Sequence, residues 1–145
     1  MQPWTFHPGD KLWAPSDALE GSYSAFFEDD GETGYFYAYD RGSEEHPILD
    51  GVFIYNVKDV KDREKASELM IYWADTHDKC ALVINDYAHA AFDFAARRGM
   101  CRADYPNFER TSEGKWPQSD HSWSDAAVAW LYGQNTESKV EARNV

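Results

Sequence analysis

The sequence predicts an α+β fold: a mostly antiparallel sheet of about five strands with two helices packed on one face. Short segments rich in aromatic and β-branched residues are separated by turn formers, which is typical of antiparallel strands. Residues 59–75 place apolar side chains at helical spacing, and residues 122–133 begin with a helix-capping pattern. The predicted order is therefore three strands, a helix, two strands and a second helix.

The first two predicted strands, residues 19–28 and 35–40, enclose a turn. Asp30-Gly31 within that turn is a strong hairpin signal. Because successive side chains of a strand alternate between its faces, the second strand carries three tyrosines on one face: Tyr35, Tyr37 and Tyr39. Residues 48–57, ILDGVFIYNV, are largely apolar on both faces, which predicts a third strand in the centre of the sheet.

The middle of the chain is predicted to form a helix and then a second hairpin. In residues 59–75 a single apolar stripe, expected to pack on the sheet, is formed by Ala66, Leu69, Met70 and Trp73. Residues 80–84, CALVI, are predicted to form a buried strand, and Asn85-Asp86 predicts a turn into a strand over residues 87–94. The alanines of this last segment leave a helix as the alternative.

The last third of the chain contains one predicted helix. Residues 97–115 are polar and irregular, whereas Ser122-x-x-Asp125 is a capping-box pattern for a helix that ends at Gly133. We expect residues 1–17 to form an N-terminal arm, residues 18–133 a single α+β domain and residues 134–145 a flexible tail.

The charge of the chain limits its partners. The net charge is −12 over 145 residues, and 16% of the residues are aromatic. A negative field disfavours direct binding to nucleic acid and to anionic membranes, and it attracts basic proteins. The alternative explanation for the excess of acidic residues is that they only keep the protein soluble.

The N-terminal sequence predicts no export. It lacks the basic and apolar regions of a signal peptide, and no apolar run approaches the about 20 residues that span a membrane. We therefore expect a cytoplasmic protein, in which a disulfide between Cys80 and Cys101 is disfavoured but left open.

Four acids lie within five positions of the first predicted hairpin: Glu28, Asp29, Asp30 and Glu32. The oxygen ligands of a calcium loop are not all present around Gly31 or Gly34. The chain also lacks the common zinc, phosphate-binding and nucleophile-elbow motifs. The sequence thus predicts no metal site, no cofactor and no catalytic residue.

One group of residues keeps an enzymatic or ligand-binding alternative open. His89 and Asp93 would touch on a helix, but on a strand they stand about 13 Å apart. Basic side chains that could grip an anionic ligand follow closely: Arg97, Arg98 and Arg102. Pairing of these arginines with nearby acids such as Asp93, Asp104 or Glu109 is the competing explanation.

Four segments together resemble a small bacterial family of unknown function, over residues 18–130: FFEDDGETGYFYAYD, ILDGVFIYNV, ELMIYWADTHDKCALVINDYAHAAFDF and ARRGMCR. The resemblance implies a stand-alone bacterial protein and no catalytic residues. In class and charge, though not in any motif, the chain is also similar to immunity proteins, which protect a cell against its own toxin.

We therefore expect an immunity protein that is not an enzyme and that occludes a basic toxin domain with an acidic, aromatic surface. The predicted contact residues are Glu28, Asp29, Asp30, Glu32, Tyr35 and Tyr37, with Glu44, Glu45, Tyr87 and His89 as weaker additions. The alternative is a small enzyme or ligand-binding protein that uses His89, Asp93 and the arginines named above.

Overall fold

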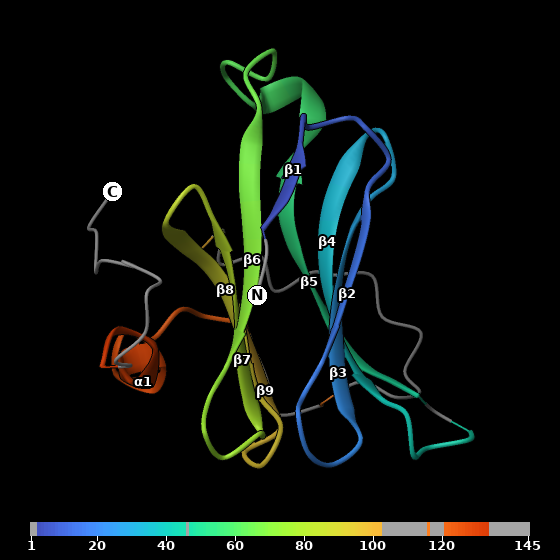
Figure 1. Cartoon of the computed structure of the whole chain (residues 1–145), viewed down its shortest axis with the longest axis vertical. Helices are drawn as coiled ribbons and strands as arrows, with labels where there is room; N and C mark the ends of the chain where they lie inside the picture. The colour runs from blue at the N-terminus through green and yellow to red at the C-terminus, as the bar shows by residue number, and fades with distance from the viewer. Residues whose placement is uncertain (1–2, 46, 103–115, 117–120, 134–145) are drawn as a thin grey trace.

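Two antiparallel sheets pack face to face in the computed structural model, which describes residues 3–45, 47–102, 116 and 121–133 (Figure 1). The five-stranded sheet has the order β1 (Trp4–Phe6), β6 (Ser67–Trp73), β7 (Lys79–Ile84), β8 (Tyr87–Asp93) and β9 (Arg98–Cys101). The four-stranded sheet has the order β2 (Trp13–Asp17), β3 (Tyr23–Asp29), β4 (Thr33–Asp40) and β5 (Ile48–Asn56).

Both predicted hairpins are confirmed, because local turn chemistry specifies them. Between β3 and β4 the backbone of Gly31 adopts φ +100°, a conformation that favours glycine. Between β7 and β8, Asn85 and Asp86 both have positive φ, as the two central residues of a type I′ turn require. The three tyrosines of β4 share one face, as predicted, and the residues between them are buried.

The predicted α+β class is wrong, because the described residues form mostly strands. Helical structure is limited to the short segments η1 (Val57–Asp59), η2 (Ala126–Val128) and α1 (Ala129–Tyr132). Only the second predicted helix is present, and in shortened form. No helix in the described ranges is long and apolar enough to cross a membrane.

The helix predicted over residues 59–75 is replaced by η1, a turn and β6. β6 is an interior strand of its sheet, flanked by β1 and β7, and both of its faces are covered. Leu69 and Ile71 enter the core between the sheets, while Met70 and Tyr72 pack on the outer side. A strand that is buried on both faces has apolar residues at every position, so it also satisfies helical spacing.

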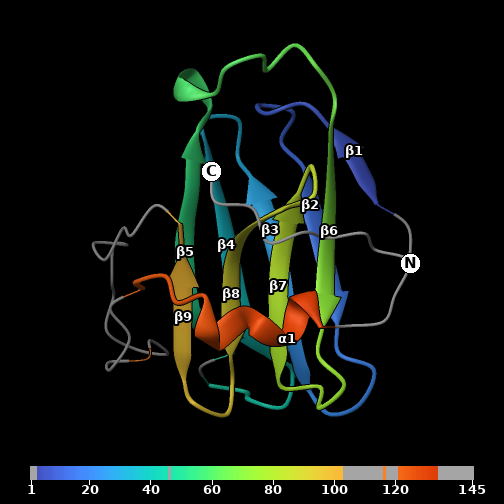
Figure 2. The ribbon, with the colours of Figure 1, turned by 90° about the vertical axis from the view of Figure 1, so that its left-hand side faces the viewer.

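The strands correct two further expectations, the central position of residues 48–57 and the irregular segment from residue 97. β5 lies at the edge of its sheet, not in the centre, next to β9 of the other sheet (Figures 1 and 2). The irregular segment predicted from residue 97 begins with β9. The residues expected to form an arm contribute β1 to one sheet and β2 to the other. The predicted tail, residues 134–145, lies outside the described residues, as do Asp104 and Glu109.

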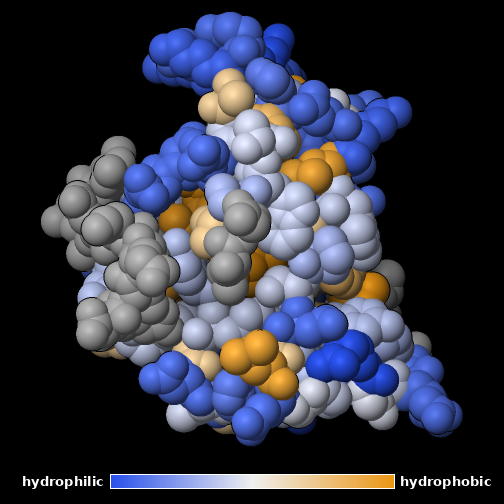
Figure 3. Space-filling view, viewed as in Figure 1, coloured by the Kyte–Doolittle hydropathy of each residue, from blue (hydrophilic) through white to orange (hydrophobic). Residues whose placement is uncertain are grey.

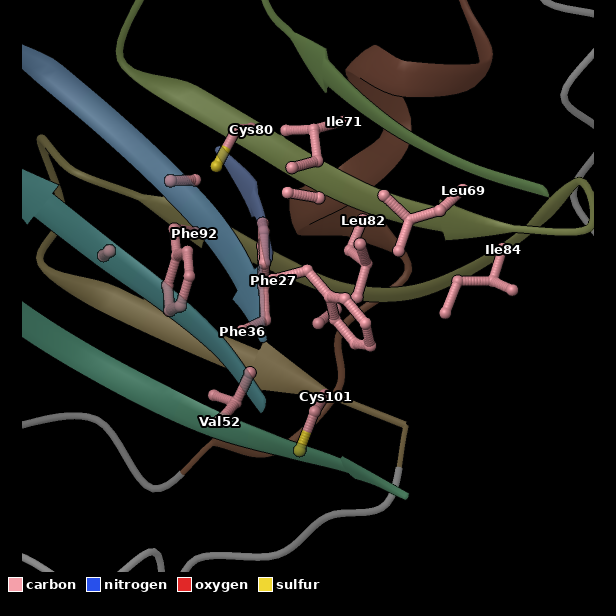
Figure 4. Close-up of a cluster of buried hydrophobic side chains, with 14 of the residues drawn as sticks. Phe27, Phe36, Val52, Leu69, Ile71, Cys80, Leu82, Ile84, Phe92 and Cys101 are labelled. Carbon is pink, nitrogen blue, oxygen red and sulfur yellow. The ribbon is translucent and has the colours of Figure 1, made fainter. Parts of the chain in front are cut away.

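Large apolar side chains from both sheets meet in the core (Figure 4). Phe36 of β4 stacks on Phe92 of β8 with ring centroids 4.9 Å apart, and both rings are buried. Burying a side chain of this size contributes about 1.5–3 kcal/mol, so such cross-sheet pairs hold the sandwich together. Cys80 and Cys101 are buried in the same core, and neither forms a disulfide.

The outer face of the five-stranded sheet is covered by the segment that contains η2 and α1 (Figure 2). Val128 and Leu131 are buried against small residues of the strands, among them Ala81 and Ala88. The N-cap of η2 is Asp125, and the preceding residue Ser124 accepts a hydrogen bond from the backbone N–H of Ala127 on its Oγ at 3.2 Å. The helix ends at Gly133, as predicted.

A buried polar pair joins this covering segment to the other sheet. Nε2 of His121 lies 3.0 and 3.2 Å from the two carboxylate oxygens of Asp50 on β5, and both side chains are fully buried. Gly99 of β9 makes room for the carboxylate, since a Cβ atom there would lie 2.6 Å from Asp50 Oδ2. His121 also bridges to Met100.

We predict that His121→Ala lowers the free energy of unfolding by about 3–5 kcal/mol, because the substitution removes the imidazole that contacts both oxygens of the buried Asp50 carboxylate. Urea denaturation measures this loss, with the exposed Glu64→Ala as the control. The double variant with Asp50→Ala should lose less than the sum of the two single losses. A loss below about 1 kcal/mol for His121→Ala would show that the pair does not hold the fold.

Candidate functional site

The outer face of the four-stranded sheet presents a row of aromatic side chains. Strand alternation turns Phe27, Phe36 and Val52 into the core, so their neighbours along each strand point outward. The register places the outward residues side by side: Trp13 beside Glu28, Phe26 beside Tyr37, and Tyr35 beside Phe53. We call this surface the outer aromatic face; it comprises Trp13, Phe26, Tyr35, Tyr37, Tyr39, Ile48 and Phe53.

The rings of the outer aromatic face contact one another across the strands. Trp13 stacks on Phe26 with centroids 4.3 Å apart, and Phe26 lies 4.8 Å from Tyr37. Tyr37 in turn lies 6.0 Å from Tyr35. Phe26 is buried under its neighbours and the tyrosines are half-buried, whereas Trp13 remains 53% exposed and Ile48 39% exposed. A rigid, exposed aromatic surface is typical of a binding site.

Acidic side chains flank this face at both ends. Asp30 and Glu32 are exposed in the turn between β3 and β4, and Glu44 and Glu45 are exposed in the loop between β4 and β5. Glu28 lies within the face, between Trp13 and Tyr35. Basic side chains also lie at both ends. Lys11 lies against Gly31 of the first turn, and Lys58 and Arg63 line a pocket together with Glu32. At the other end Arg41 donates hydrogen bonds to Ser24 Oγ and Gly21 O.

The pKa values of two side chains in this region, Tyr37 and Asp30, are shifted by their surroundings. Burial and the nearby Glu28 raise the pKa of Tyr37 to about 12, which keeps its hydroxyl neutral and able to donate a hydrogen bond. Backbone hydrogen bonds from Glu32 and Thr33 lower the pKa of Asp30, so this exposed carboxylate stays charged.

Asp29, the fourth acid of the turn, points into the molecule and is 1% exposed. Its Oδ1 accepts a hydrogen bond from Gly31 N at 2.8 Å, and its Oδ2 accepts one from Gly9 N at 2.7 Å and one from the Tyr55 hydroxyl at 2.6 Å. Burial and this hydrogen bond raise the pKa of Tyr55. Asp29 therefore organises the turn and cannot contact a partner.

The other predicted contact residues, Tyr87 and His89, belong to β8 of the opposite sheet. The Arg102 guanidinium lies 4.7 Å from the centre of the Tyr87 ring and 4.0 Å from that of Trp123. A bulge in β8 pairs Ala88 with Val83 and Ala90 with Leu82, so His89 is the extra residue. The alternation predicted for residues 87–94 is therefore broken at His89.

The residues of the enzymatic alternative do not converge. Asp93 and Arg98 pair at the far end of β8 and β9, where Asp93 accepts a hydrogen bond from Ala96 N at 3.0 Å. Four residues along a strand separate His89 from Asp93 by about 13 Å. Of the three arginines, Arg102 is the one near His89, since its backbone N–H donates to His89 O at 2.9 Å. Within the described part of the chain, no group of three or more His, Cys, Asp or Glu side chains could hold a metal.

Tyr35 and Tyr37 were predicted from the sequence as contact residues, whereas other members of the outer aromatic face were not. Trp13 faces outward because its neighbour Ala14 on the edge strand β2 enters the core, and Phe26 faces outward because Phe27 on β3 does the same. Consecutive residues of a strand point to opposite faces of the sheet, so Phe26 must point away from the face that carries Phe27. This alternation is the sequence signal that could have predicted Phe26 as part of the outer face.

We predict that Asp29→Ala lowers the free energy of unfolding by about 2–4 kcal/mol, because three donors lose their charged acceptor. The matched control is Asp30→Ala, which removes a carboxylate next in sequence that is exposed and supports only the turn. Thermal or urea unfolding compares the two variants. Equal losses would contradict the structural role of Asp29.

Comparison with known proteins agrees with the predicted bacterial family. A family model described as "Uncharacterized protein conserved in bacteria (DUF2251)" matches residues 6–132. An uncharacterized protein of Haemophilus influenzae is 43% identical over 109 residues, which cover 75% of this chain and 66% of that relative, just under two thirds of its length. No solved structure matches the chain. The chain belongs to the DUF2251 family of bacterial proteins.

Proposed function

We propose that this protein binds a basic partner protein on its outer aromatic face, and that it acts as an immunity protein that neutralises a toxin. The observation that carries the proposal is a row of contacting rings with Trp13 at 53% exposure, bordered by acids at both ends. The α1 segment covers the opposite side of the sandwich (Figures 1 and 2). Exposed aromatic patches of this kind favour protein contacts.

The charge pattern favours a protein over the other ligands of aromatic surfaces. Single-stranded nucleic acids also stack on aromatic rings, but their phosphates need a positive groove. Here Glu28, Asp30 and Glu32 are among the bordering side chains, and the chain as a whole carries a net charge of −12. Acids at the rim attract a basic partner and accelerate its approach. A toxin that acts on nucleic acid or nucleotides presents such a basic cleft, which this face would cover.

Two kinds of side chain have different roles in the proposed contact. Trp13 and Tyr37 are the anchors, since rigid rings bury a large area at a small cost in side-chain entropy. Glu32, Glu44 and Glu45 lie at the ends of the face and would steer the partner. The separated positions of His89, Asp93 and Arg98 give the enzymatic alternative no comparable support.

We predict that Trp13→Ala weakens binding by about 2 kcal/mol, or roughly 30-fold, because the substitution removes the most exposed ring of the outer aromatic face. The partner is first captured with the wild-type protein and identified by mass spectrometry; it should be basic, toxic when expressed alone and neutralised by co-expression. Calorimetry then compares the variants, with Asp86→Asn in the exposed turn between β7 and β8 of the other sheet as the control. A partner bound equally by wild type and Trp13→Ala would refute this face.

Replacing Glu32, Glu44 and Glu45 together by Gln should slow association and reduce its dependence on salt, with a smaller effect on dissociation. Stopped-flow mixing at several ionic strengths measures both rates. The same charge change at Glu64, Glu68 and Asp86 is the control. Equal slowing by both triple variants would show that the net charge, and not this border, steers the partner.

A further inference from the structure

A pocket of about 450 Å³ lies at one end of the sandwich, away from the outer aromatic face. It opens under the loop that joins β5 to β6, which is the hydrophilic region at the top of Figure 3. Its walls come from segments that are far apart in sequence: Phe6 of β1, Ile54 and Tyr55 of β5, and Ile84 at the end of β7. The volume suits a small organic molecule.

The inner part of the pocket is apolar. Phe6 and Ile84 are buried members of the core between the sheets, and Ile54 and Tyr55 pack against that core. The hydroxyl of Tyr55 is bound to Asp29, so the ring presents its apolar surface to the pocket. This part would accept an aromatic or branched apolar group.

The rim of the pocket is locally basic, in contrast to the chain as a whole. Lys61 and Lys65 line it together with one acid, Asp62, and all three are exposed. The rim therefore carries one net positive charge in a chain whose net charge is −12. A single positive charge matches a monoanion such as a carboxylate better than a phosphate dianion.

His89 adds a directed polar group to this pocket. The bulge in β8 places its side chain in the pocket lining. Among the described residues, none forms a hydrogen bond with its imidazole nitrogens. Burial and the neighbouring Arg102 lower the pKa of His89 to about 4, so the ring is neutral at pH 7 and has one N–H donor.

We propose that this pocket binds a small carboxylate with an aromatic or branched apolar body. The body lies between Phe6, Ile54 and Ile84, the carboxylate meets Lys61 and Lys65, and the His89 imidazole donates a hydrogen bond to the ligand. The site is independent of the outer aromatic face, and its failure would leave the proposed function untouched.

The test is a titration of the ¹⁵N-labelled full chain followed by NMR, with benzoate and its neutral counterpart benzamide as probes. Benzoate should shift amides of the pocket lining in a saturable way, with a Kd of about 1 mM as expected for so small a molecule. Benzamide should bind at least about fivefold more weakly, because it lacks the charge. Absence of saturable shifts up to about 20 mM benzoate, or equal binding of both probes, would overturn the proposal.

Two sets of variants locate the binding groups. Lys61→Ser with Lys65→Ser should weaken benzoate about fivefold or more, whereas Lys58→Ser with Lys79→Ser, the same charge change outside the pocket, should not. His89→Phe should weaken benzoate, and His89→Gln, which keeps a donor, should retain it. Equal weakening by both lysine pairs would assign the effect to the general field and refute the site.

Discussion

The buried contact between Asp50 and His121 is the constraint on which the arrangement of the sandwich depends. Burial of a carboxylate is costly unless it is paired, so the contact of Asp50 with His121 favours one relative position of β5 and the segment from residue 121. Gly99 contributes by leaving space for the carboxylate at the edge where β5 meets β9. The packed rings of the core and this polar pair act together, since both are satisfied only in one alignment of the sheets.

This alignment makes the two outer faces of the sandwich different. His121 anchors the start of the segment whose η2 and α1 cover the five-stranded sheet, and the small side chains of that sheet, such as Ala81 and Ala88, accommodate Val128 and Leu131. The four-stranded sheet instead carries large rings that contact one another and leave Trp13 exposed. Small residues on one face and aromatic residues on the other therefore separate a structural face from a face suited to binding.

The same separation of roles applies to the acids of the first turn. Asp29 gathers donors from Gly9, Gly31 and Tyr55, and it fixes the turn from inside. Asp30 caps the turn from outside, which leaves Glu28 and Glu32 without a role in the turn. Because these hydrogen bonds hold the backbone of the turn, the side chains of Glu28 and Glu32 start from defined backbone positions beside the rings.

The sequence by itself determined the features that depend on neighbours along the chain. The turns at Gly31 and Asn85, the tyrosine face of β4 and the helix ending at Gly133 follow from backbone preferences and strand alternation. Tertiary structure decided what depends on distant residues. Residues 67–73 became a strand because two neighbouring strands satisfy the hydrogen bonds of their backbone, which helical spacing cannot reveal. Packing between distant segments decides that Asp29 is buried while Asp30 is exposed, and it decides where the bulge places His89. It also brings His121 to Asp50 across 71 residues. No local pattern in the sequence connects these segments.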